Sequence, residues 1–254
     1  MYKSLEGIYY RIKRRFELGL MMNRLGIASS DVYPQYLLDQ LFILRSEILN
    51  IEQVVDVGAN EGMFSRSMTV LFPDLVFYCI EPNKNLNTEI RKNLKSNQVT
   101  VVNELASNKV MPVTFNIHED SQMSSILGVE ENKLKKNFEW DNPEKIEKVE
   151  LTSSTLDILC EQHQVDLSKK TLLKIDTQGN ELDVLKGASG CLPSFHYIIV
   201  EYMFDSPYVG ETSSNDLFKL LFDKGFIFSG PTMYANRVDG KIGAINFLFK
   251  KQQG

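Results

Sequence analysis

Short apolar runs and helix-forming stretches alternate along most of the chain. Runs of apolar residues, rich in β-branched and aromatic side chains, recur at 54–57, 75–80, 99–102, 113–117, 171–175 and 197–200. Stretches typical of helices follow at 62–72, 84–94, 156–163, 181–188 and 214–224. A strand that is apolar on both sides must be covered on both sides. This order therefore predicts an α/β domain in which a mostly parallel sheet has helices on both faces.

The end of the chain departs from this rhythm. Apolar runs at 226–228 and 245–249 lie on either side of Asp239-Gly240, a dipeptide typical of turns. We expect these two runs to form a long antiparallel hairpin that closes the sheet.

The beginning of the chain is predicted to be a helical extension, residues 1–50, before a main domain at 51–254. Apolar side chains at helical spacing indicate a helix over 34–48. A basic cluster beside aromatic residues could lie on an anionic membrane surface as a peripheral contact. The alternative, which we favour, is a helix packed on the domain with its basic face in solvent. The cluster comprises Arg11, Lys13, Arg14 and Arg15.

A polar insertion interrupts the main domain at about 118–150. Charged residues of both signs dominate 130–150, which is typical of a solvated helix or loop. Phe138 and Trp140, the only tryptophan, lie within it. We expect either a lid over a substrate or a surface helix with one apolar side.

Composition and charge narrow the classes of function. The chain has 254 residues and a formal net charge of −5, which speaks against a nucleic acid partner. Its three cysteines are widely spaced and include no CxxC pair, so a reducing compartment such as the cytoplasm fits best. No run of about 18 apolar residues predicts a transmembrane helix, and the first residues lack the apolar run of a signal peptide.

The strongest motif is a glycine turn between the first strand and its helix. A dinucleotide site needs GxGxxG, but Asn60 and Met63 stand at the second and third glycine positions. The turn therefore suits a ligand without phosphate and with a cationic centre, and Asp56 can supply negative charge to it directly or through water. The turn that we expect to contact this ligand comprises Gly58, Ala59, Asn60 and Gly62.

A second motif is the carboxylate of Glu81, which ends the second strand about 20 residues after the turn. An acidic residue at this place can accept hydrogen bonds from both ribose hydroxyls of a nucleoside. The alternative is a negative charge at the start of the helix near Asn83. The upstream turn favours the ribose role.

Together these motifs resemble those of the FkbM-type methyltransferases over roughly residues 51–250. The segments that carry the resemblance are Asp56 to Gly62, Glu81-Pro82-Asn83, Ser124-Ser125, Thr155-Leu156-Asp157, Leu173 to Glu181, Val184 to Ala188 and Asn246 to Phe249.

The resemblance implies a class I methyltransferase fold, which is Rossmann-like and has a seven-stranded, mostly parallel sheet with a C-terminal antiparallel hairpin. It also implies S-adenosylmethionine as the methyl donor, and usually O-methylation of a sugar, glycan or secondary metabolite. It places the adenine near Leu105, Ala106 and Ser107, and extends the cofactor site to Pro82 and Ser124.

Methyl transfer to a hydroxyl needs alignment of the acceptor and removal of its proton. Asp176 and Glu201 end two strands that should be neighbours, so both carboxylates should project from one rim, next to the cofactor methyl. Asp176 is also expected to belong to the cofactor site. Either of them acts as general base, or both hold a divalent cation such as Mg²⁺ that acidifies the acceptor. A purely structural alternative is that Asp176 caps its turn and Glu201 pairs with Lys174. His118, in the loop before Ser124, is a further candidate for the base.

Two rival hypotheses concern the activity itself. The fold could bind the cofactor without catalysis, as an interaction module, although Gly58, Gly62, Glu81 and Asp176 are all present. A short NAD-dependent oxidoreductase is disfavoured because GxGxxG is missing. The sequence identifies neither the acceptor nor the oligomeric state, and a homo-oligomer is compatible with it.

Overall fold

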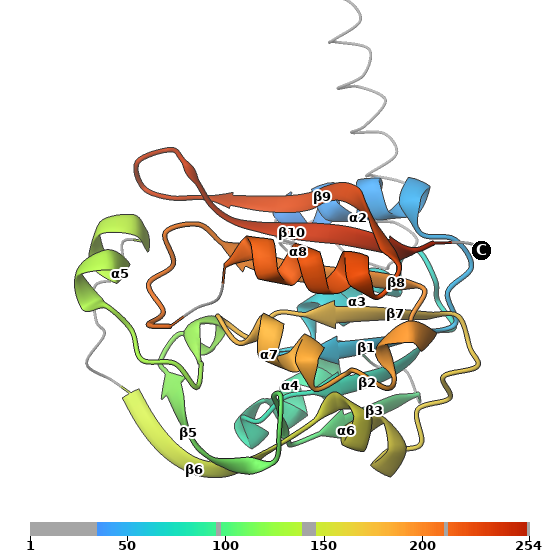
Figure 1. Cartoon of the computed structure of the whole chain (residues 1–254), viewed down its shortest axis with the longest axis horizontal. Coiled ribbons are helices and arrows are strands. Elements are labelled where there is room, and N and C mark those ends of the chain that lie inside the picture. Colours follow the sequence, from blue (N-terminus) through green and yellow to red (C-terminus); the bar gives the residue numbers. More distant parts are fainter. Residues whose placement is uncertain (1–34, 95–97, 139–145, 211–212, 253–254) are drawn as a thin grey trace, which may run out of the picture.

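One sheet of seven strands organises the protein, of which the computed structural model describes residues 35–94, 98–138, 146–210 and 213–252 (Figure 1). The strand order is β3-β2-β1-β7-β8-β10-β9. Neighbours from β3 to β8 pair in parallel, whereas β10 pairs antiparallel with both β8 and β9. This confirms the predicted class I methyltransferase fold with its closing hairpin. The strands are β1 (Gln53–Val57), β2 (Val76–Ile80), β3 (Val99–Val102), β7 (Thr171–Ile175), β8 (Tyr197–Met203), β9 (Phe226–Asn236) and β10 (Ile242–Lys251).

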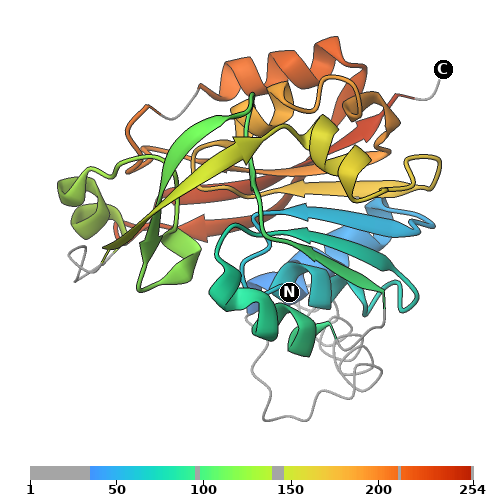
Figure 2. The same ribbon diagram turned by 90° about the horizontal axis from the view of Figure 1, so that it is seen from below.

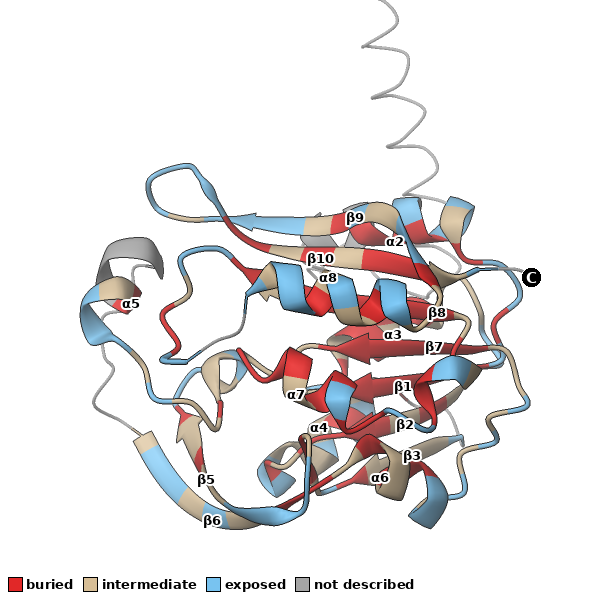
Figure 3. Cartoon of the chain, viewed as in Figure 1, coloured by how far each residue is buried: buried red, intermediate tan, exposed pale blue. Residues whose placement is uncertain are grey.

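Helices cover both faces of this sheet, as predicted (Figure 2). On one face α2 (Gln35–Glu47), α3 (Met63–Met68) and α4 (Asn87–Asn93) enclose one hydrophobic core. On the other face α6 (Leu156–Gln162), α7 (Glu181–Lys186) and α8 (Ser214–Asp223) enclose a second one. Figure 3 shows the consequence, since the central strands are buried along their length. Short 3₁₀ turns lie at η1 (Lys84–Leu86), η2 (Ser121–Met123) and η3 (Leu192–Ser194).

Local sequence fixes where several helices begin and end. The Thr155 side chain accepts the backbone N–H of Ile158 and so caps the start of α6. The Ser213 hydroxyl does the same for the N–H of Asn215 at the start of α8. After α8, Gly225 takes a positive φ of 78°, which turns the chain directly into β9.

A second, three-stranded sheet arches over the carboxyl ends of β1 and β2, with the order β4-β6-β5. Its strands are β4 (Leu105–Ala106), β5 (Met111–His118) and β6 (Ile146–Ser154), and α5 (Glu131–Phe138) lies between β5 and β6. The strand expected at 113–117 is therefore present, but it belongs to this sheet. The solvated helix expected within 130–150 is α5, whereas the helix or loop interpretation was wrong for 146–150, which lie in β6.

Two predictions fall outside the described residues. The basic cluster lies in residues 1–34, and Trp140 lies in 139–145. The helix expected over 34–48 is α2. Within the described ranges no helix is both long and apolar enough to cross a membrane. Cys79, Cys160 and Cys191 are buried free thiols.

Candidate active site

A cavity of about 370 Å³ opens at the carboxyl ends of the central strands, within the size range of small-ligand sites. The turn after β1, the end of β2 and the ends of β7 and β8 line it, together with residues of the second sheet and of the β9–β10 hairpin. This is the edge at which open α/β sheets bind their ligands.

The turn after β1 begins at Gly58, whose φ is +78°. Its backbone N–H donates to the Ile80 carbonyl oxygen at 2.9 Å, which ties the turn to β2. On its other side, a Cβ atom would stand 1.8 Å from the carbonyl oxygen of Asp176. A glycine is therefore required at position 58 because the protein's own backbone lies so close, in addition to any requirement that a ligand sets. The turn ends at Gly62, also at positive φ, which precedes α3.

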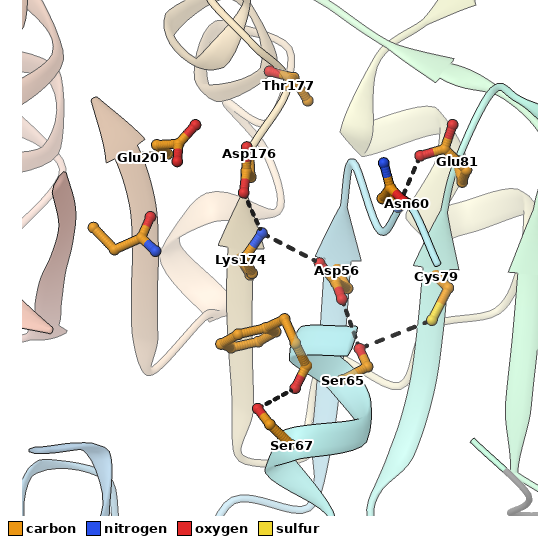
Figure 4. Close-up of polar contacts among 12 residues, drawn as sticks. Asp56, Asn60, Ser65, Ser67, Cys79, Glu81, Lys174, Asp176, Thr177 and Glu201 are labelled. Atoms are coloured by element: carbon orange, nitrogen blue, oxygen red, sulfur yellow. Dashed lines mark hydrogen bonds and ion pairs between the residues drawn. The ribbon is translucent and has the colours of Figure 1, made fainter. Parts of the chain in front are cut away.

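Glu81 is buried at the end of β2 and holds this turn through backbone amides. Its Oε2 accepts the N–H of Asn60 at 2.9 Å (Figure 4). Its Oε1 accepts the N–H of Asn83, also at 2.9 Å. Burial raises the pKa of Glu81 to about 7 against these two hydrogen bonds. Each carboxylate oxygen keeps a lone pair for a hydroxyl donor in the cavity.

Asp56 lies beneath the cavity, and its side chain is fully buried. Its Oδ2 accepts the Ser65 hydroxyl at 2.7 Å, and its Oδ1 lies 3.9 Å from the Lys174 ammonium. Burial raises the pKa of Asp56. Asp56 does not line the cavity, because Ser65 of α3 packs on its side chain, and its negative charge toward a ligand, directly or through water, stays a prediction. Figure 4 shows Lys174 between Asp56 and Asp176.

Asp176 directly follows β7, and Glu201 lies on β8. Both side chains line the cavity, as predicted. The Lys174 ammonium donates to Asp176 Oδ2 at 2.9 Å. The Gln178 amide nitrogen donates to Asp176 Oδ1 and to Glu201 Oε2, each at 2.8 Å. In the purely structural alternative, Glu201 pairs with Lys174. The structure shows that Lys174 instead forms its close ion pair with Asp176.

The two carboxyl groups differ in how readily they ionise. Burial disfavours the charged form of Asp176, but the positive charge of Lys174 outweighs burial and lowers the pKa of Asp176. Burial, followed by the negative charge of Asp176, raises the pKa of Glu201 well above its usual value. Asp176 therefore ionises more readily than Glu201.

The structure brings most of the predicted residues around the cavity and leaves four outside its lining. His118 is buried at the end of β5, where its backbone N–H bonds the Ser124 hydroxyl at 3.2 Å, so Ser124 rather than His118 reaches the cavity. Burial also lowers the pKa of His118. The lining includes Gly58, Ala59, Asn60, Glu81, Pro82, Leu105, Ala106, Ser124, Asp176 and Glu201, and does not include Asp56, Gly62, Ser107 or His118.

Sequence reasoning missed Gln178 as a functional residue, although it lies in a segment that carries the family resemblance. Its φ of +56° is unusual for a residue other than glycine and lets one amide bridge two strand ends. The Tyr208 hydroxyl lies 3.1 Å from Gln178 Oε1, and the Ser125 hydroxyl donates to the Gln178 carbonyl oxygen at 2.7 Å. Gln178 thus links the carboxyl pair to the loops above it.

A divalent cation fits these residues poorly. The ammonium of Lys174 already occupies one side of Asp176 and would repel a cation there. Across the residues that the structure describes, no three His, Cys, Asp or Glu side chains are grouped to hold a metal ion.

Comparisons with known proteins point to one family. The Methyltransferase FkbM domain matches residues 56–228. No curated protein matches the sequence.

Similar solved structures share little sequence. Precorrin-6y C5,15-methyltransferase from Geobacter metallireducens GS-15 is 12% identical with a TM-score of 0.44, over 89% of this chain and 92% of that one. Ribosomal protein L11 methylase from Lactobacillus delbrueckii subsp. bulgaricus is 11% identical with a TM-score of 0.47, over 87% and 81%. An S-adenosylmethionine-dependent methyltransferase from Aquifex aeolicus is 12% identical with a TM-score of 0.42, over 83% and 89%.

Proposed function

Because the chain belongs to the FkbM methyltransferase family, whose members are S-adenosylmethionine-dependent methyltransferases, we propose that it methylates a hydroxyl oxygen of a sugar, glycan or secondary metabolite. The negative net charge supports a small-molecule or glycan acceptor over a nucleic acid. The three reduced cysteines support a cytoplasmic location.

The cofactor lies along the turn after β1 in this proposal. Glu81 accepts hydrogen bonds from the ribose hydroxyls through the lone pairs that Asn60 and Asn83 leave free. Leu105 and Ala106 line the cavity beyond Glu81 and provide an apolar place for the adenine. The turn from Gly58 to Asn60 lines the cavity near Asp176, where the methionine part and the methyl group fit.

Glu201 is the general base. Bound S-adenosylmethionine supplies a methyl carbon whose bond to sulfur breaks as the acceptor oxygen bonds to it. The acceptor hydroxyl loses its proton to the ionised form of Glu201, whose raised pKa makes it a stronger base than Asp176. Lys174 keeps Asp176 ionised, and the negative charge of Asp176 maintains the basicity of Glu201.

The observation that carries the proposal is the bridge of Gln178 between the two carboxyl groups, at 2.8 Å to each, at the rim where the methyl acceptor must enter. It holds a base and its neighbouring anion in fixed positions, which a purely structural ion pair does not need.

The test is methyl transfer from isotopically labelled S-adenosylmethionine to a panel of hydroxyl compounds, with mass spectrometric detection of a methyl ether. We expect Glu201→Gln to lower kcat by about 10²–10⁴-fold while S-adenosylhomocysteine binding persists. Glu89→Gln, at a partly exposed residue paired with Lys92, is the matched control and should retain full activity. Cofactor binding without transfer to any hydroxyl would instead favour the non-catalytic binding module.

A further inference from the structure

Three residues stand side by side across the last three strands of the sheet. Asn246 of β10 pairs with Glu201 of β8 on one side and with Met233 of β9 on the other. Directly opposed residues of antiparallel strands point to the same face. All three line the cavity, so this row extends the site from the base toward the hairpin.

Asn246 is buried, with 2% of its surface exposed, yet its amide is poorly satisfied. Its Oδ1 has no hydrogen-bond partner within the described part of the chain. Its Nδ2 contacts the Met233 sulfur, at 3.7 Å, and a thioether is a weak acceptor. Buried polar atoms are nearly always paired, so an unpaired one in a residue that lines a cavity calls for a ligand.

Neighbouring contacts hold Asn246 in place. The Gln40 amide donates to the Thr232 hydroxyl at 3.2 Å, and that hydroxyl donates to the Asn246 carbonyl oxygen at 3.3 Å. Gln40 and Thr232 are themselves buried. The backbone at Asn246 is therefore fixed between α2 and β9, opposite Glu201.

The mouth of this part of the cavity is apolar. Tyr234 lines the cavity and is 60% exposed, and Met233 lies next to it. An aromatic side chain at the rim offers a flat surface to a ring that carries its polar groups on its edge.

We propose that Asn246 determines which acceptor is methylated, by accepting a hydrogen bond from a second hydroxyl next to the one that Glu201 deprotonates. Because Oδ1 can only accept, the acceptor must bring a donor. The Cα atoms of opposed residues on neighbouring strands stand about 5 Å apart. Two hydroxyls on adjacent carbons fit this separation, with one hydrogen bond to each residue. The substrate class is therefore a 1,2-diol on a ring, as in a sugar. This inference rests on the proposed function.

The first experiment compares methyl glycosides of common hexoses with their monodeoxy analogues as acceptors. For the wild type we expect kcat/KM to fall at least 10-fold when the neighbouring hydroxyl is removed. In Asn246→Leu the side chain has a similar shape but lacks the acceptor atom. This variant should have a kcat/KM for the diol at least 10-fold lower than the wild type. Its kcat/KM values for the diol and for the monodeoxy analogue should be equal. Its affinity for S-adenosylhomocysteine should match the wild type. Asn236→Leu, at the exposed end of β9, should behave as the wild type.

The second experiment needs no acceptor. If Asn246 serves to bind the acceptor and does not stabilise the fold, Asn246→Leu should have a Tm equal to or above that of the wild type, because the substitution removes an unpaired buried atom. A Tm several degrees lower would mean that Asn246 is structural and would overturn the inference. Equal rates of the wild type with diol and analogue would overturn it too, while leaving O-methylation intact. Absence of transfer to every hydroxyl would fail the proposed function itself, and the Tm comparison would still decide whether Asn246 is structural.

Discussion

Gly58 and Asp176 are in direct backbone contact, since a Cβ atom at Gly58 would stand 1.8 Å from the carbonyl oxygen of Asp176. Gly58 begins the turn that we assign to the cofactor, and Asp176 belongs to the carboxyl pair that we assign to catalysis. The contact joins β1 to β7 where the two halves of the site meet, so a change on one side must displace the other.

Replacement of Gly58 by alanine should damage both halves of the site. The added Cβ atom would clash with backbone that cannot rotate away, and the positive φ of 78° adds strain. We expect a Tm lower by several degrees and loss of measurable S-adenosylhomocysteine binding by calorimetry.

Gly240→Ala is the matched control for this variant. Gly240 has nearly the same φ, +79°, but no atom lies within 4 Å of the place that an added Cβ atom would take. It should cost only about 1–2 kcal/mol of backbone strain and leave binding intact. Equal effects of the two substitutions would show that the contact with Asp176 is unimportant.

Cofactor affinity should depend on pH through Glu81. Its pKa is raised to about 7, and ribose hydroxyls bind the ionised carboxylate, so affinity should be constant well above pH 7 and fall as the pH drops below it. The limiting slope is about 10-fold per pH unit. Calorimetric titration with S-adenosylhomocysteine across this range measures it.

Glu81→Gln should bind weakly at every pH and lose this dependence. The glutamine NH₂ group would face a backbone N–H of Asn60 or Asn83, so one of two hydrogen bonds would be lost and the turn displaced. A variant that binds as tightly as the wild type well above pH 7, where the wild-type carboxylate is ionised, would refute the ribose role.

The central part of the fold could be predicted because its strands are apolar on both faces. Val54 and Val55 point to opposite helical layers, and both are fully buried. The strand β6 could not be recognised, since it is covered on one side only. Its exposed Glu147, Lys148 and Glu150 made the segment look like a solvated helix.

The site could be predicted where it depends on parallel strands, because their carboxyl ends must meet at one edge. This brought Glu81, Asp176 and Glu201 together. Asn246 was not predicted as a functional residue because it lies on an antiparallel strand, and the register of the hairpin cannot be read from the sequence. The burial of Asp56 could not be predicted, because Asp56 stands opposite Lys174 beneath α3, and this packing depends on the position of a helix.

Chelation of divalent cations should leave the activity unchanged. The Lys174 ammonium, 2.9 Å from Asp176, supplies the positive charge that a metal ion would bring. We expect the same kcat in excess EDTA and in added Mg²⁺. Loss of activity in EDTA with recovery in Mg²⁺ would contradict this and would restore the metal hypothesis for Asp176 and Glu201.

Asp176→Asn should move the pH profile of the enzyme to lower pH. Catalysis requires ionised Glu201, so kcat/KM is high above the pKa of Glu201 and falls as the pH decreases through it. Burial raises this pKa first, and the negative charge of Asp176 raises it further. Asparagine keeps the shape but removes the charge, so Glu201 should ionise at lower pH and the acidic limb should shift in that direction.

The same substitution should also lower the maximal rate, because a carboxylate with a lower pKa is a weaker base. Glu201→Gln provides the comparison, since it should remove the acidic limb altogether together with most of the rate. Profiles of kcat/KM against pH for the wild type and both variants distinguish the roles. An acidic limb that stays in place or moves to higher pH in Asp176→Asn would contradict the role of Glu201 as the base whose pKa Asp176 raises. An active Glu201→Gln together with an inactive Asp176→Asn would assign the proton transfer to Asp176 instead.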